Sequence, residues 1–188
     1  MKKAFIFLLL CFYAISCNQN NSFNEGEYLK NGKEIYQLTG KTLVGKVKKA
    51  IKEDGPFGAI DFCKLKAYPL TDSLSKLYQA EITRVAIKYR NLNSKANKQE
   101  EKVINDYIKQ LSQNIELKPI VIAEKEIIHY YAPIKVEHAC LTCHGNPGSN
   151  IPDTLYNHIK NLYPDDIAID FKEGDIRGIW RIRFKSNL

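Results

Sequence analysis

Hydrophobic positions in the first half of the chain recur every three or four residues, the spacing of an amphipathic helix. This spacing extends over residues 33–53 and predicts a long helix, which the sequence DGPFG at 54–58 would end. The sequence AIDFCKLKAY at 59–68 predicts a second helix ended by Pro69, and DSLSKLYQ at 72–79 predicts a short third one. The first half is therefore expected to be helical.

The second half changes between the helical period and the two-residue alternation of strands. Because helices come first and strands with intervening helices follow, the pattern predicts an α+β domain rather than alternating βαβ units. The expected elements are a strand at 81–91, a helix at 97–114 with Asn97 as its N-cap, a hairpin of 118–125 and 126–136, a short helix at 153–163 before Pro164, and a final strand at 173–184.

The N-terminal sequence MKKAFIFLLLCFYAISC is typical of a secretory signal peptide, since two lysines precede an apolar run too short to span a bilayer stably. Its last residues, AISC, resemble a lipobox, in which a small residue precedes the cysteine that receives the lipid. We expect residues 1–16 to be removed and Cys17 to be lipidated. Cleavage without a lipid is the alternative. Both predict an exported chain, and the lipid would anchor it at the periplasmic face of a bacterial membrane.

Residues 17–32 are polar and rich in asparagine, which predicts a flexible tether before a single domain at 33–188. A chain of 188 residues with 44% hydrophobic residues is long enough to bury a core. The net charge of +7 comes from lysines and arginines spread along the chain. With no known reader motif beside them, a nucleic-acid partner is not expected.

The sequence ACLTCHGNPG at 139–148 is the main chemical signal. Cys140, Cys143 and His144 form C-x-x-C-H, the spacing for covalent haem attachment. The two thiols add to the vinyl groups of the porphyrin, and the histidine ligates the iron. Three alternatives remain. A thiol-redox pair is disfavoured by the following glycines and proline, and a zinc site would need two further ligands from His129, His138, His144 and Cys63. A structural disulfide between Cys140 and Cys143 would close a very small loop.

The second axial ligand of such an iron is not a methionine, because the one methionine, Met1, leaves with the signal peptide. A non-protein ligand or an open position is also compatible with the sequence. Cys63 could be a ligand, but its neighbours in the sequence are apolar. Its alternative role is therefore that of a small buried side chain without ligand function. The protein candidates are Cys63, His129, His138 and His158.

Four segments in this order resemble a family of exported monohaem c-type proteins with a PAS-like fold: FGAIDFCKLKA, ITRVAIKYRN, YYAPIKVEHACLTCHG and YPDDIAIDFKEGDIRG. The resemblance covers about residues 35–185. It implies an antiparallel PAS-like sheet with N-terminal helices packed against it, and a haem between sheet, helix and attachment loop. It also implies His144 as the proximal ligand and Cys63, followed four positions later by Ala67, as the distal one.

By the same analogy, Arg84, Arg90 and Arg177 are expected nearest the haem propionates. Structural ion pairs are the alternative role for these arginines. The family often has R-N-P-x-N-x-P after the first strand, and this chain departs from that pattern. It keeps Arg90 and Asn91 but has Leu92, Ser94 and Ala96 at the later positions.

One covalent haem c with histidine and thiolate ligands predicts a low reduction potential. The resemblance favours a redox or ligand sensor that works with a separate signalling or redox partner. A membrane-tethered electron-transfer cytochrome is the alternative, and a zinc or thiol-redox module remains if no haem is attached. No catalytic grouping is visible, and Asp165 and Asp166 are interpreted as a turn or helix cap, so an enzyme is not expected.

Overall fold

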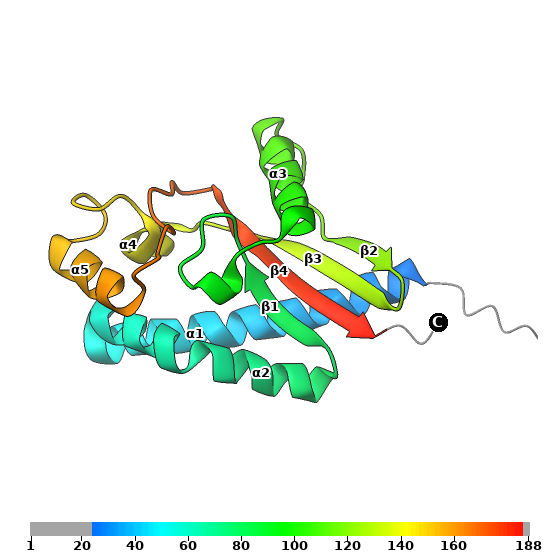
Figure 1. Cartoon of the computed structure of the whole chain (residues 1–188), viewed down its shortest axis with the longest axis horizontal. Coiled ribbons are helices and arrows are strands. Elements are labelled where there is room, and N and C mark those ends of the chain that lie inside the picture. Colours follow the sequence, from blue (N-terminus) through cyan, green and yellow to red (C-terminus); the bar gives the residue numbers. More distant parts are fainter. Residues whose placement is uncertain (1–23, 186–188) are drawn as a thin grey trace, which may run out of the picture.

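A four-stranded antiparallel sheet forms the centre of this computed structural model, which describes residues 24–185 (Figure 1). The expected signal peptide and Cys17 lie outside the described residues. The strand order is β1-β4-β3-β2, so the last strand pairs with the first one along the chain. The strands are β1 (Glu81–Val85), β2 (Ile120–Glu124), β3 (Ile127–Lys135) and β4 (Ile176–Lys185).

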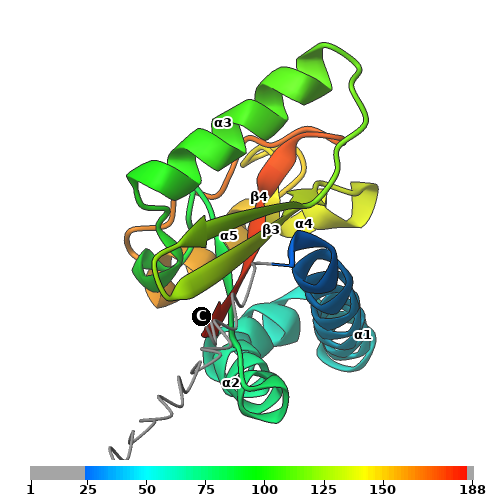
Figure 2. The ribbon, with the colours of Figure 1, turned by 90° about the vertical axis from the view of Figure 1, so that its right-hand side faces the viewer.

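Helices cover both faces of the sheet, as the side view in Figure 2 shows. Helices α1 (Glu25–Leu65) and α2 (Ala67–Tyr78) pack on one face, and α3 (Lys98–Ser112) packs on the other. Alternate residues of β3 serve the two layers: Tyr130 joins the core cluster under α1 and α2, and Tyr131 joins the cluster under α3. This confirms the predicted α+β class with a PAS-like antiparallel sheet.

A smaller helical region caps one end of the sheet (Figure 1). It contains two 3₁₀ turns, η1 (Leu92–Ser94) and η2 (His138–Cys140), and two helices, α4 (Leu141–His144) and α5 (Asp153–Leu162). Helix α5 is held on the end of α1 by a buried apolar cluster that includes Ile60, Leu155 and Ile159. This contact brings the cysteine motif toward the end of α1.

Helix α1 begins earlier than the sequence pattern predicts. Residues 25–32 are helical, so the expected tether 17–32 is wrong over this part, and so is a domain boundary at residue 33. The Asn24 side chain accepts a hydrogen bond from the Glu27 amide and caps the helix. Gly32 then lies against the ring of the buried Tyr130. Leu29 also packs against the core, so tertiary packing stabilises a mostly polar segment that has little helical signal of its own.

The first helix is kinked where the sequence DGPFG predicts its end. Gly55 has φ 69° and ψ −172°, and Pro56 starts the next helical piece, where its missing N–H is not needed. A second break occurs at Lys66. Pro69 lies in the first turn of α2, so the prediction that it ends a helix is wrong, and the helix expected at 72–79 is the second half of α2.

Strand β1 is shorter than the 81–91 expected, because Ala86 turns away from the sheet. The Ala86 amide donates to the Ser94 carbonyl at 2.9 Å, and the Ala86 carbonyl accepts from the Ala96 amide at 3.0 Å. The helix after Asn97, the hairpin, the 153–163 helix and the final strand agree with the prediction within a few residues at each end. Asn97 and Glu100 form a reciprocal capping box.

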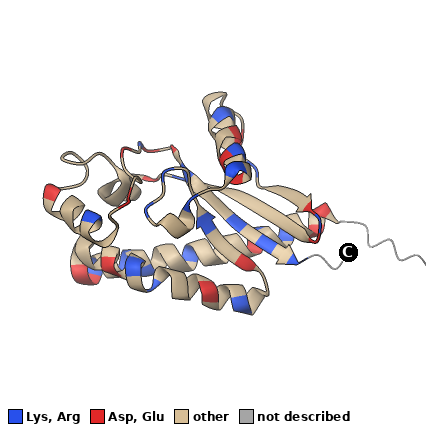
Figure 3. Ribbon diagram, viewed as in Figure 1, with Lys and Arg blue, Asp and Glu red and all other residues tan. Residues whose placement is uncertain are grey.

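Charged residues of both signs are interspersed over the helices, whereas β4 carries three arginines and no acidic residue (Figure 3). None of the helices within residues 24–185 combines the length and the apolar character that a bilayer crossing requires.

Candidate functional site

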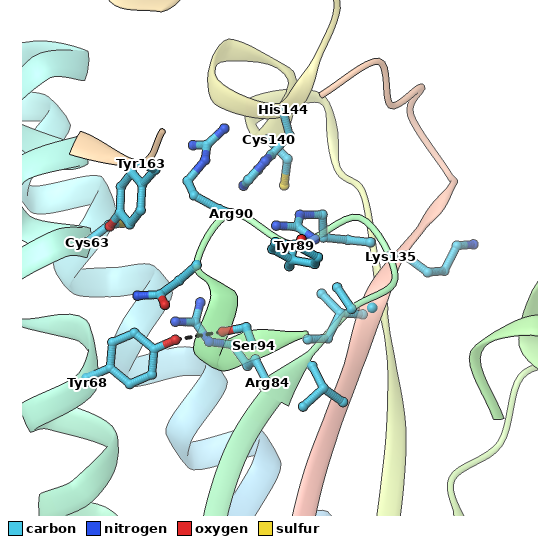
Figure 4. A pocket seen from close by; sticks show the side chains of 16 residues that line it. Cys63, Tyr68, Arg84, Tyr89, Arg90, Ser94, Lys135, Cys140, His144 and Tyr163 are labelled. Carbon is cyan, nitrogen blue, oxygen red and sulfur yellow. Dashed lines mark hydrogen bonds between the residues drawn. The ribbon is translucent and has the colours of Figure 1, made fainter. Parts of the chain in front are cut away.

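A cavity of about 240 Å³ lies between the sheet end, the end of α1 and the cysteine motif (Figure 4). Side chains from five separate parts of the chain line it, because β1 pairs with β4 and α5 packs on α1. Most of the residues singled out from the sequence face this one space. They are Cys63 of α1, Arg84 of β1, Arg90 of the following loop, Cys140 and His144 of the motif, and Arg177 of β4.

His144 is held in one tautomer. Its Nδ1 is 2.8 Å from the Ala168 carbonyl oxygen, which only accepts hydrogen bonds, so Nδ1 carries the proton. Burial, together with the positive charges of Arg177 and Arg90, lowers the pKa of His144 well below its usual value. The imidazole is therefore neutral, and its Nε2 keeps a lone pair for a metal. The ring also meets Phe171 edge-on, at 6.3 Å between centroids.

Cys63, Cys140 and Cys143 are unbonded thiols in this structure. Burial raises the pKa of Cys63, while the nearby Arg84 and Arg90 act in the opposite direction. Cys143 does not line the cavity; it packs against the apolar cluster under α5, and burial raises its pKa. Thiolate sulfur and imidazole nitrogen are ligands that transition metals such as iron and zinc accept.

The three arginines of the cavity differ in their partners. Arg90 forms a salt bridge with the buried Asp166, at 3.3 Å from Nη2 to Oδ2. Arg177 donates from Nη1 to the Lys88 carbonyl at 2.8 Å, and its buried Nε has no hydrogen-bond partner. Arg84 lies over the Trp180 ring, 5.7 Å from the centroid.

Two of these guanidinium groups, those of Arg84 and Arg177, lose solvation without gaining a salt bridge to a carboxylate. Burial lowers the pKa of Arg177 to about 9, with Arg90 and Arg84 adding to the effect, and it is also the main cause that lowers the pKa of Arg84. Within residues 24–185, neither Arg84 nor Arg177 has a carboxylate at salt-bridge distance. Two partly buried cations with no carboxylate at salt-bridge distance suit a ligand that carries two negative charges.

The other histidines lie away from this cavity. His129 is buried on β3 beside Tyr131, with its Nε2 3.6 Å from Glu124. The exposed His138 pairs with Glu173, and His158 pairs with Asp61. Of the protein ligand candidates, the cavity therefore brings only Cys63 to the same space as His144. Among residues 24–185, no three His, Cys, Asp or Glu side chains gather closely enough to hold a metal ion by themselves.

Several residues of the site were not predicted from the sequence. Asp166 was interpreted only as part of a turn or cap; it does accept from the Ala168 amide at 2.9 Å, but it is also the partner of Arg90. Tyr68 and Ser94 share a 2.7 Å hydrogen bond at the cavity wall. The motif Y-P-x-D-x-A was the available signal for Asp166. The neighbouring sequence does not indicate that Asp166 would form a salt bridge with the distant Arg90.

The comparisons with known proteins agree with this architecture. The family model described as Tll0287-like matches residues 17–185. The crystal structure of the cyanobacterial heme-protein Tll0287 is similar in fold, with a TM-score of 0.64 and 22% sequence identity over 86% of this chain and 97% of that chain. No curated protein matches the chain. Because the family model spans nearly all of the sequence, the chain belongs to the Tll0287-like family.

Proposed function

We propose that this protein binds one haem c, attached through thioether bonds at Cys140 and Cys143. His144 and Cys63 would both serve as ligands of the iron. The observation that carries the proposal is the cavity itself: Cys140, the His144 imidazole with its bare Nε2, and the Cys63 sulfur all border the same space. The similar crystal structure of a heme-protein supports the same reading.

The charges of the cavity also fit this group. A haem carries two propionates, and Arg84 and Arg177 are the two arginines of the cavity that lack a carboxylate partner at salt-bridge distance. The orphaned Nε of Arg177 gives one donor that a propionate would satisfy. Arg90 is already paired with Asp166. We therefore assign propionate binding to Arg84 and Arg177 rather than to all three arginines.

A bound haem supplies a reversible one-electron change and an exchangeable ligand position. The protein's residues set how that chemistry is expressed. His144 presents a neutral nitrogen because its Nδ1 proton is held by Ala168. Arg84 and Arg90 favour the thiolate form of Cys63 against the effect of burial. An anionic sulfur ligand stabilises the oxidised metal, so a low reduction potential is expected.

The position of Cys63 favours a sensor that works with a separate partner. Cys63 lies on the part of α1 that follows the kink at Gly55, so this short piece is set apart from the long N-terminal part of the helix. Loss of the contact between Cys63 and the iron would let this part of the helix move. A partner protein that contacts its exposed Phe57 and Leu65 would detect the movement. An exported chain held by lipid at Cys17 would perform this role at the periplasmic face of the membrane.

Optical spectra of the mature protein, produced with a c-type haem maturation system, test the ligand set. Wild type, Cys63→Ala and His138→Ala are compared, oxidised and reduced. We expect a thiolate-type ferric spectrum in wild type and His138→Ala, since His138 is exposed and outside the cavity, and its loss in Cys63→Ala. A haem spectrum that does not change in Cys63→Ala would exclude Cys63 as a ligand.

A further inference from the structure

Arg90 contacts both the backbone directly before His144 and the carboxylate of Asp166. Its Nη2 donates to the Cys143 carbonyl oxygen at 2.5 Å, directly before His144 in the chain. Its Nε and Nη2 also donate to the two oxygens of Asp166, each at 3.3 Å. The Asp166 side chain is fully buried and that of Arg90 is 11% exposed, so water competes little for these contacts.

Asp166 continues the connection to the imidazole. Its Oδ1 accepts from the Ala168 amide at 2.9 Å, and the carbonyl of the same Ala168 accepts the Nδ1 proton of His144 at 2.8 Å. The contacts therefore close into a ring through His144, Ala168, Asp166, Arg90 and Cys143. The ring fixes the backbone before His144 and the acceptor of its imidazole together.

We propose that Arg90 and Asp166 are positioning residues that orient His144 and hold its proton on Nδ1. This inference rests on the proposed function for its consequence, which is a proximal ligand held in one orientation. Charge-assisted hydrogen bonds are stronger than neutral ones, and outer partners of a metal-binding histidine fix its tautomer and ring orientation. Arg90 thus supports the iron ligand through its contacts with the Cys143 carbonyl and Asp166 instead of binding a propionate.

A purely structural ion pair elsewhere in the protein provides a matched control. Arg181 pairs with Glu100 at 2.5 Å from Nη1 to Oε1, and the Glu100 side chain is 2% exposed. This pair joins β4 to α3 and does not border the cavity. Glu100→Gln removes a buried charge as Asp166→Asn does, but it has no route to His144.

The test is histidine ¹⁵N NMR of the full mature chain in the reduced state, with exchange of the His144 Nδ1 proton as the readout. The signal is expected whether or not haem is attached, so the readout does not depend on the proposed function. Asp166→Asn and Arg90→Lys are expected to speed proton exchange by about tenfold, because losing a hydrogen bond to a charged group weakens the closed form from which the Nδ1 proton does not exchange. Glu100→Gln is expected to leave it unchanged.

Two results would overturn the inference. One is slow exchange in Arg90→Lys and Asp166→Asn alike, with stability lowered as in Glu100→Gln, which would make the pair merely structural. The other is a His144 that carries its proton on Nε2 in wild type. Arg90→Lys keeps the charge and serves as the informative variant if Asp166→Asn does not fold. A mature chain that carries no haem after production with a c-type haem maturation system would contradict the proposed function. A protected Nδ1 proton in that chain would leave the positioning role standing.

Discussion

Cys63 and His144 line the same cavity, although one belongs to the first helix and the other to the attachment motif in the second half of the chain. The sheet alone does not bring them together. The packing of α5 on the end of α1 through Ile60 and Ile159 does so, because α5 follows the motif directly. The site thus depends on a contact between two helices outside the sheet.

Gly32 tests how the long helix is seated on the sheet. A Cβ at this position would lie 2.3 Å from the ring of the fully buried Tyr130. We expect Gly32→Ala to lower the free energy of unfolding by roughly 1–3 kcal/mol, as overpacking does, in a denaturant titration. Gly45→Ala, on the same helix with open space around it, is the control. It should raise stability by about 0.5–1 kcal/mol. A neutral Gly32→Ala would contradict this seating.

The arginines without carboxylate partners should tune the haem. Removing a positive charge from the cavity wall favours the oxidised iron, so Arg84→Gln and Arg177→Gln are each expected to lower the reduction midpoint potential. The shift should be on the order of 60 mV, which corresponds to a tenfold change in a one-electron equilibrium. Redox titration of the purified protein measures it. Arg183→Gln, which removes a cation already paired with Glu81, should shift the potential far less. Equal shifts in all three variants would contradict the assignment.

His129 should make stability depend on pH. Burial lowers its pKa, and the nearby Arg183 and Arg181 add to this, while Glu124 opposes it. In the unfolded chain His129 therefore binds its proton near pH 6.5, whereas in the folded chain it binds the proton only at lower pH. Because the unfolded state binds more protons in this range, the free energy of unfolding falls as the pH drops from about 7 to 5. His144 contributes with the same sign, so wild type must be compared with a variant.

We expect His129→Gln to lose less stability than wild type over this pH range, measured by urea unfolding at each pH. The exposed His138 meets water in both states, so His138→Gln should behave as wild type does. A pH dependence that is the same in His129→Gln as in wild type would show that His129 accepts its proton equally in both states.

The sensor role predicts a local change at the end of α1. If reduction weakens the contact of Cys63, amide hydrogen exchange should become faster in residues 56–65, after the kink at Gly55. Residues 98–112 of α3 provide the internal reference, since they pack on the opposite face of the sheet. Exchange in 56–65 that is identical in both redox states would favour the electron-transfer alternative, because a carrier needs no structural change.

Local signals made much of the fold predictable. The capping box of Asn97 and Glu100 and the alternation in β3 are short-range patterns, and the elements they predict are present. Segments held by distant contacts were predicted less well. Residues 25–32 are mostly polar, and their helix is packed through Leu29, which contacts the core, and Gly32, which lies against Tyr130. Ala86 leaves the strand pattern because its backbone bonds with Ser94 and Ala96.

The candidate site follows the same division. The spacing of Cys140, Cys143 and His144 is visible in the sequence, and the cavity brings Cys63 into the same space as Cys140 and His144. The partner of each arginine is not visible. Arg90 and Asp166 are far apart in the chain, and their pairing is set by the tertiary fold. From the sequence alone, the three arginines look equivalent. The structure shows that Arg90 has a carboxylate partner, whereas Arg84 and Arg177 have none at salt-bridge distance.

The intact mass of the mature protein, purified under denaturing conditions from cells with a c-type haem maturation system, tests the central claim most directly. The account predicts that the wild-type chain is heavier by about one haem than the variant in which Cys140 and Cys143 are both changed to serine. A wild-type chain without this added mass, from cells that mature another c-type cytochrome, would contradict covalent haem attachment.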